Sequence, residues 1–278
     1  MEYLMLVSEF VSKNLANRPL KYGTKQSYLK IIKSLGIWEL DTSELNSGLI
    51  FDRVDQMRSH NVKKNVYICL RSVFKELGLF KDLPIMAGIS KNYDLPSQEE
   101  LHAVIERSKY RLRLYLCMYA GLRVGEACAV VPSQLQGNYL VVDRAFSQDG
   151  KHLGSPKTSG KVLIPEWLAT EVSEMKKEEY WQIGMSTLLV SWACGNLSKR
   201  TSGKRINPHM LRHWYATDMI RRGVNPETVR RQMRHSNINT TMRIYVQINS
   251  QDLEDSVPSR PESHHQESNV LRLPQRSA

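Results

Sequence analysis

Apolar residues recur every three or four positions through the first part of the chain, which is the spacing of amphipathic helices. In the segment 24–35, for example, Tyr28, Ile31 and Ile32 hold such positions while lysines fill polar ones. The pattern predicts helices over about Glu2–Lys13, Thr24–Leu35, Phe51–Ser59 and Lys64–Leu79. Residues 84–94 contain Pro84 and Gly88 and little periodicity, which predicts a linker. We therefore expect a helical N-terminal domain at 1–83 and a second domain at 95–257.

The second domain begins with a local signal for a helix start. Ser97 and Glu100 have the spacing of a capping box, and helical patterns continue to about Val130. Apolar segments at 139–143 and 162–164 then predict a small β region, with two short strands around the turn KTSGK at 157–161. Residues 166–181 return to a helical pattern. The fold class expected is mainly α with a small β-sheet.

Asparagine–proline pairs mark two further helix starts. Asn207 is suited to an N-cap with Pro208 in the first turn, Gly223 is suited to end that helix, and Asn225 repeats the start. A last helix is predicted at about 240–250. The tail at 258–278 is polar and rich in Ser, Gln and Pro, so we expect it to be disordered.

Charge narrows the choice of partners. The chain has 278 residues, 41% of them hydrophobic, and a net charge of +11, which favours a polyanion such as nucleic acid or an acidic membrane surface. Its most apolar long window, 114–131, is interrupted by Arg123 and Glu126 and cannot span a bilayer unaided. The N-terminus lacks the basic leader of a signal peptide. Nucleic acid is thus the better partner, and basic residues recur along the N-terminal helices, including Lys25, Lys63 and Lys64.

The cysteines indicate a reducing compartment. Four are present, without a CxxC pair, and they are expected to be buried thiols of a cytosolic protein, not disulfides or zinc ligands.

The stretch HMLRHWYAT, at 209–217, raises three alternatives for its chemistry. A zinc site on His209 and His213 would need a glutamate where Met210 stands, and Arg212 would repel a cation. A helix-turn-helix at 221–245 is possible, but any pair of basic helices resembles one. An anion site is favoured, because residues 199–235 hold ten Lys and Arg against two acidic residues. Upstream, Arg123 opens a helix and could bind an anion, pair with Glu126, or do both.

Four segments of the chain occur in a characteristic order: GLRVGE, SPKTSGKVLIP, HMLRHWYAT and RHSNINTTMRIYV. Together they resemble the motifs of the tyrosine site-specific recombinases, the family of phage integrases and chromosome-dimer resolvases. The similarity covers about Leu95 to Asn249, and the N-terminal helices resemble that family's core-binding domain. One departure is Arg234, since a glycine commonly precedes the histidine in the family.

The resemblance implies a set of catalytic residues. They are two phosphate-clamping arginines, a β-hairpin lysine, the histidine of the His-x-x-Arg pair, a later histidine and a nucleophilic tyrosine: Arg123 and Arg212, Lys157, His209, His235 and Tyr245. Glu126 would support Arg123. The implied reaction passes through a 3′-phosphotyrosine and uses no metal, cofactor or ATP.

The resemblance also implies the partners. The first is double-stranded DNA with core attachment-type sites, held in a C-shaped clamp. The second is further copies of the chain, which would form a homotetramer on two DNAs. A directionality or host accessory factor is a possible additional partner, and no membrane is expected. The expected location is the cytoplasm, at the nucleoid when DNA is bound. An integrase is expected, and the alternatives are a resolvase, a relaxase of the type IB topoisomerase kind, and a catalytically silent DNA-binding regulator.

Overall fold

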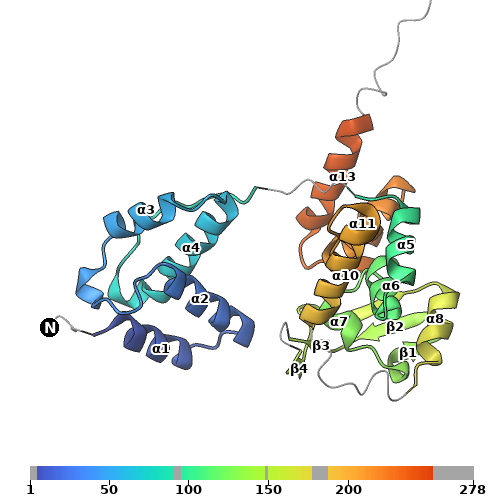
Figure 1. Ribbon diagram of the computed structural model, residues 1–278, viewed down its shortest axis with the longest axis horizontal. Helices are drawn as coiled ribbons and strands as arrows, with labels where there is room; N and C mark the ends of the chain where they lie inside the picture. The colour runs from blue at the N-terminus through green and yellow to red at the C-terminus, as the bar shows by residue number, and fades with distance from the viewer. Residues whose placement is uncertain (1–4, 90–94, 148–149, 177–186, 253–278) are drawn as a thin grey trace, which may run out of the picture.

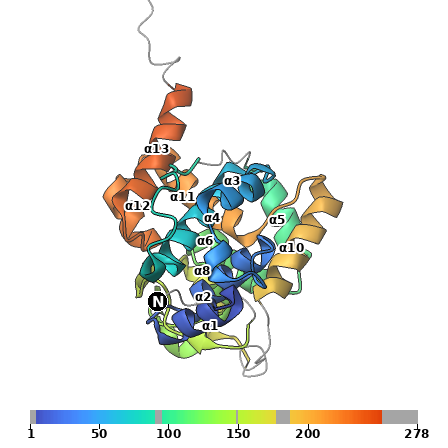
Figure 2. The ribbon, with the colours of Figure 1, turned by 90° about the vertical axis from the view of Figure 1, so that its left-hand side faces the viewer.

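The computed structural model describes residues 5–89, 95–147, 150–176 and 187–252, and its helices gather into two lobes (Figure 1). The N-terminal lobe is built from α1 (Val7–Asn17), α2 (Tyr22–Ser34), α3 (Ser47–Asp55) and α4 (His60–Val73), with short 3-10 turns at Thr42–Glu44 and Lys75–Leu77. Residues 84–89 follow this lobe without helix or strand, and residues 90–94 of the predicted linker lie outside the described residues. Seen from the N-terminal side, the N-terminal lobe lies in front of the C-terminal lobe, and α13 rises clear of both (Figure 2).

A buried apolar cluster holds the N-terminal lobe together. Phe74, fully buried, stacks on Phe10 with ring centroids 5.6 Å apart and meets Phe80 edge-on at 5.4 Å. These rings fill the space on which the apolar faces of α1 and α4 converge, and burial of such side chains is the main stabilising term of a small helical lobe.

The helix boundaries in this lobe differ from those expected. α1 begins at Val7, because the backbone carbonyl of Met5 accepts a hydrogen bond from the Thr42 amide and Leu6 pairs with Asp41. Residues 2–4 lie outside the described residues. α3 begins four residues earlier than predicted, because the Asn46 side chain accepts from the Leu49 amide and caps the helix. α4 likewise runs from 60 to 73 and not from 64 to 79.

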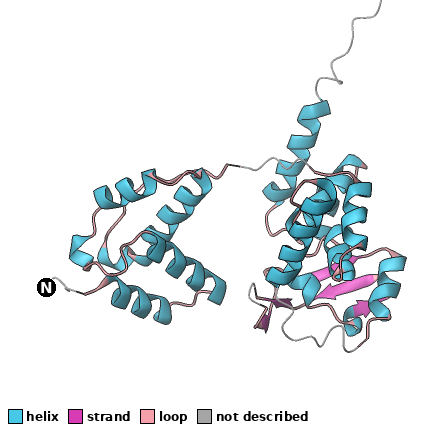
Figure 3. Cartoon of the chain, in the orientation of Figure 1, coloured by secondary structure: helices cyan, strands magenta, loops and turns pink. Residues whose placement is uncertain are grey.

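The C-terminal lobe packs helices around one face of a small sheet (Figure 3). In chain order its elements are α5 (Gln98–Glu106), α6 (Arg111–Tyr119), α7 (Val124–Cys128), β1 (Leu135–Gln136), β2 (Tyr139–Val142), β3 (Ala145–Phe146), β4 (Leu153–Gly154), β5 (Gly160–Leu163), α8 (Glu166–Ser173), α10 (Thr187–Ser202), α11 (Pro208–Arg221), α12 (Pro226–Met233) and α13 (Ile238–Asp252). The mainly helical fold class with a small sheet is confirmed.

Side-chain caps start three of these helices where the sequence predicts them. Ser97 and Glu100 form the capping box of α5. The side chains of Asn207 and Asn225 accept amide hydrogen bonds at the starts of α11 and α12, and Gly223 follows α11 with a φ of 76°. α11 packs directly on α6, which is almost entirely buried. These caps therefore fix where each helix enters the core.

The strands correct one prediction. β5 pairs antiparallel with β2, placing Val162 opposite Leu140, and both side chains are buried. β4 pairs instead with β3 in a separate two-stranded ribbon. Two short strands therefore flank KTSGK as predicted, but they do not pair with each other as the arms of a β-hairpin, since that segment connects strands of different sheets. β5 pairs with β2 because this pairing buries the side chains of both strands in the apolar core, whereas β4 is exposed.

α10 was not predicted, and the reason lies in its buried face. That face holds Thr187, Gly195 and Ser198 beside Val190 and Cys194, so small and polar residues replace the usual apolar stripe. The helix predicted at 166–181 is described as α8 only to Ser173, and residues 177–181 and the tail at 258–278 lie outside the described residues.

The cysteine and membrane predictions can also be checked. All four cysteines are buried and free, as expected, and burial raises the pKa of the Cys194 thiol to about 12. No helix within the described ranges is long and apolar enough to cross a bilayer. The apolar window 114–131 is divided between α6, a turn and α7.

We expect Phe74→Ala to destabilise the N-terminal lobe by about 3–5 kcal/mol, because it empties the centre of that lobe's core. Hydrogen exchange should report faster exchange of α1 and α4 amides and unchanged protection of α6 and α11. Phe51→Ala, at the half-buried edge of the same cluster, should have a smaller effect. Equal loss of protection in both lobes would contradict the independence of the two cores.

Candidate active site

Arg212 lies at the centre of the C-terminal lobe, on α11, and is almost fully buried. Its guanidinium donates to the carbonyl of Gly121, at the end of α6, and to the carbonyl of Met233, at 2.5 Å. Gly121 has a φ of 61°, and a Cβ there would lie 2.6 Å from the sulfur of Met233. Only glycine fits this position, so the turn GLR brings the backbone close enough to hold Arg212.

Arg123 and Glu126 form the second part of the site, at the start of α7. The Arg123 backbone amide donates to Glu126 Oε2 and its Nη1 donates to Oε1, both at 2.9 Å. The Glu126 side chain is 1% exposed, whereas that of Arg123 is 31% exposed. Arg123 is therefore tied to Glu126, as one alternative held, and still reaches the surface.

Arg234 joins this pair, which the sequence did not predict. It ends α12, its side chain is 3% exposed, and its Nη2 donates to Glu126 Oε2. Its Nε donates to the carbonyl of Thr158 at 3.4 Å, so it also contacts the segment that carries Lys157. One buried carboxylate thus serves two guanidiniums, and a third, Arg212, lies close enough to act electrostatically on Arg234 and Arg123.

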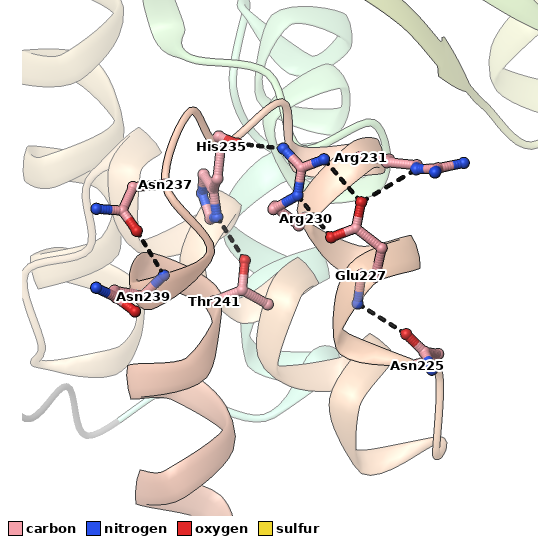
Figure 4. A network of polar contacts seen from close by, with 8 residues as sticks. All are labelled: Asn225, Glu227, Arg230, Arg231, His235, Asn237, Asn239 and Thr241. Carbon is pink, nitrogen blue, oxygen red and sulfur yellow. Dashed lines mark hydrogen bonds and ion pairs between the residues drawn. The ribbon is translucent and has the colours of Figure 1, made fainter.

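His235 follows Arg234 and is held from two sides (Figure 4). Its Nδ1 lies 2.9 Å from the hydroxyl of Thr241 on α13, and its carbonyl accepts from Arg230 Nη1 at 3.0 Å. Arg230 is itself oriented by Glu227, whose two carboxylate oxygens accept from Nε and Nη2 at 2.7 Å. Thr241 therefore orients the imidazole of His235 and Arg230 holds its backbone, and neither contact was predicted.

The pKa shifts follow from burial and from the arginines. Burial, then the positive charges of Arg212 and Arg123, lower the pKa of His235 to about 4. His209 lies on the surface of α11, yet partial desolvation of its ring and the same two arginines lower its pKa as well. Burial and Arg123 lower the pKa of Arg212 to about 9. Burial and the neighbouring arginines thus both disfavour the protonated imidazoles, so His209 and His235 are neutral near pH 7.

Lys157 and Tyr245 lie at the edges of this cluster. Lys157 is exposed in the connection between β4 and β5, one residue before Thr158. Tyr245 is half-buried on α13, one helical turn after Thr241, and packs against the small apolar cluster that joins α11, α12 and α13. Neither side chain has a hydrogen bond or ion pair with a described residue. Lys157 is thus one residue from a contact of Arg234, and Tyr245 is one helical turn from the threonine that contacts His235.

The remaining predicted residues lie apart from the cluster. Lys25 on α2 donates to the carbonyl of Ala16 at 3.3 Å, and Lys63 on α4 pairs with Asp55 at 3.3 Å. Lys64 is half-buried on α4. In the part of the chain that the structure describes, no three His, Cys, Asp or Glu side chains are placed to hold a metal ion. The structure therefore brings together Arg123, Glu126, Arg212 and His235, with His209 on the same helix as Arg212.

Comparison with known proteins identifies the family of the chain. The model of the phage integrase family matches residues 97–252, more than half of the chain. The chain is 30% identical over 208 residues to the tyrosine recombinase XerA of Thermococcus onnurineus, covering 66% of this chain and 70% of the relative. The chain therefore belongs to the phage integrase family and is a tyrosine recombinase.

Solved structures show the same fold. A Tn1549 transposon integrase in complex with a circular intermediate DNA has a TM-score of 0.70 at 15% identity, covering 90% of this chain and 99% of that one. A lambda integrase tetramer bound to a Holliday junction has a TM-score of 0.62 at 16% identity, covering 87% of this chain and 78% of that one.

The low pKa of His235 predicts a loss of stability in acid. The unfolded imidazole titrates near 6.5 and the folded one near 4, so between these values the unfolded state alone binds the proton. We expect the contribution of His235 to stability to be complete above about pH 6.5 and to be lost as the pH falls toward 4, by up to about 3 kcal/mol. Urea unfolding of wild type and His235→Gln at pH 7.0, 5.5 and 4.5 measures this. Since the other titrating groups are shared, parallel pH profiles for the two proteins would contradict it.

Proposed function

We propose that this tyrosine recombinase is a phage-type integrase that cuts and rejoins double-stranded DNA through a 3′-phosphotyrosine at Tyr245, without metal or nucleotide cofactor. The observation that carries the proposal is the buried arginine cluster around Glu126 at the junction of α7, α11 and α12. A cluster with more guanidiniums than carboxylates, open at Arg123, is suited to a DNA phosphate.

In the proposed cleavage, the Tyr245 oxygen attacks the scissile phosphorus while the bond from phosphorus to the 5′-oxygen breaks. Extra negative charge develops on the non-bridging oxygens, and the guanidiniums of Arg123 and Arg212 stabilise it. A neutral imidazole, His209 or His235, can accept the tyrosine proton, and Lys157 can supply one to the leaving 5′-oxygen. Attack by another 5′-hydroxyl reverses these steps, so the bond energy is conserved and no ATP is consumed.

Both lobes would contact the DNA. The net charge of +11 and lysines such as Lys25, Lys63 and Lys64 on the N-terminal lobe support contacts to the phosphate backbone. The Tyr22 ring packs edge-on against His152 with centroids 5.3 Å apart, joining the N-terminal lobe to the segment just before β4. We infer that the lobes close around DNA as a C-shaped clamp on core attachment-type sites, placing the protein at the nucleoid.

Assembly as a homotetramer on two DNAs belongs to the same proposal. The lambda integrase tetramer on a Holliday junction has this fold, and the end of α13 projects away from its own lobe (Figure 1). Val246, on the turn after Tyr245, is 61% exposed and could be covered by a neighbouring copy. A directionality or host accessory factor would be an additional partner.

The second candidate is a chromosome or plasmid resolvase, which the identity to XerA favours. Its chemistry would be the same, and the two differ in whether the sites lie on one DNA or two. Recombination between sites on separate plasmids, compared with excision between sites on one plasmid, distinguishes them. A silent DNA-binding regulator would form no covalent adduct at all.

Tyr245→Phe should retain DNA binding and form no covalent adduct, because the ring still packs on α13 but lacks the nucleophilic oxygen. The probe is the duplex that purified protein selects from a randomised pool, nicked near the cleavage position so that the cut product is trapped, and adducts are counted on denaturing gels. Tyr215→Phe is the matched control, since Tyr215 belongs to the same apolar cluster, and it should form the adduct. Adduct in Tyr245→Phe, or its loss only in Tyr215→Phe, would assign the nucleophile elsewhere.

Lys157→Ala should slow cleavage by roughly a hundredfold or more if this lysine protonates the leaving oxygen. Replacing the bridging 5′-oxygen by sulfur should restore most of the rate, because a thiolate leaves without a proton. Arg212→Ala should stay slow on the sulfur substrate, and Lys161→Ala, an exposed lysine on β5, should behave as wild type on both. An equal response of Lys157→Ala and Arg212→Ala to sulfur would make Lys157 a phosphate contact and not the acid.

A further inference from the structure

Arg234 occupies a backbone position that favours glycine. Its φ is 52°, in the left-handed region that non-glycine residues adopt at a cost, and apart from Phe80 no other described non-glycine residue has a positive φ. A glycine would adopt this backbone conformation, in the turn between α12 and α13, without strain. The presence of arginine in this strained conformation therefore points to a use for its side chain.

The side chain extends into the candidate active site. It is almost fully buried, shares the Glu126 carboxylate with Arg123, and reaches the Thr158 carbonyl. Gly160 gives it room, since a Cβ there would lie 3.2 Å from Arg234 Cδ. Its Nη1 is buried and has no hydrogen-bond partner among the described residues. A buried guanidinium with an unused donor is unfavourable unless an anion compensates it.

Charge counting shows what Arg234 adds. Arg123, Arg212 and Arg234 contribute three positive charges and Glu126 one negative charge, so the cluster has an excess of two. Without Arg234 the excess would be one. A phosphodiester carries one negative charge, and the pentavalent state of its transesterification carries a second on the non-bridging oxygens. The excess of two matches that reacting state better than the ground state.

We propose that Arg234 is a positioning residue of the phosphate site: it shares Glu126 with Arg123 and adds, from a buried position, the cluster's third positive charge beside the reacting phosphate. This inference rests on the proposed strand cleavage. The same side chain, through Thr158, holds the segment that carries Lys157. Arg234 also contributes to the lowered pKa of His235, after burial, Arg212 and Arg123, as a charge next to the site should.

The test compares cleavage of the selected, nicked duplex by wild type, Arg234→Gly, Arg234→Lys and Arg107→Gln. We expect Arg234→Gly to cleave roughly ten- to a hundredfold more slowly, as loss of one charged group near the reacting phosphate does elsewhere. Arg234→Lys, which keeps the charge but not the two-pronged geometry, should fall between. Arg107→Gln removes an equal charge from the exposed end of α5 and should cleave at the wild-type rate.

A second substrate separates electrostatics from a structural defect. A methylphosphonate at the scissile position removes one negative charge from both the ground and the reacting state. The deficit of Arg234→Gly relative to wild type should then shrink to about threefold or less, as expected when the charge it complements is gone. An equal deficit on both substrates would overturn the proposal, since misfolding slows both alike.

Folding is checked by thermal unfolding. If Arg234→Gly is not folded at the assay temperature, Arg234→Asn replaces it, because asparagine also tolerates the left-handed region. Wild-type cleavage rates in these variants would overturn the role of Arg234 and leave strand cleavage intact. Absence of adduct with wild type itself would instead refute the proposed function, and this inference with it.

Discussion

The candidate active site depends on one buried carboxylate that two arginine side chains share. Glu126 is buried at the start of α7 and accepts from the backbone and side chain of Arg123 and from the guanidinium of Arg234. An isolated buried charge would be costly, and so would clustered guanidiniums without a counter-charge. One carboxylate among three arginines compensates part of this cost and leaves an excess of positive charge. Together with burial, that excess lowers the pKa values of His209 and His235, and it makes the site suited to a phosphate.

The surrounding fold keeps these charges in place. Gly121 lets the end of α6 approach α12 and α11, so that backbone carbonyls from two segments accept the Arg212 guanidinium. Gln232 bonds both the amide and the carbonyl of Leu163, at 3.1 and 2.6 Å, and thereby fixes α12 against β5. The helix ends and the strand thus converge on the cluster, while the pair formed by His235 and Thr241 couples it to the helix that bears Tyr245.

The sequence predicts what is decided locally. The helix starts at Ser97, Asn207 and Asn225 were predicted correctly, because each of these side chains accepts a hydrogen bond from an amide two or three residues away. α10 was not predicted because the residues on its buried face are small or polar. The pairing of β5 with β2 was not predicted because it depends on packing in the core and not on local sequence. The link between Arg234 and Glu126 spans 108 residues and lacks a periodic signal. Charge and helix-start signals indicated an anion site at Arg123 and Arg212, whereas His235 was predicted only through resemblance to a family.

The central claim, that the cluster around Glu126 holds the scissile phosphate, is tested most directly by the pKa of His235 with and without DNA. NMR titration of the imidazole in Tyr245→Phe, free and bound to the selected duplex, measures it without cleavage. Burial lowers this pKa most and stays in place, but a phosphate seated among the arginines offsets their positive charge, so the pKa should rise part of the way from about 4 toward 6.5. An unchanged pKa in the bound protein would contradict the account, because it would place the phosphate away from the arginines.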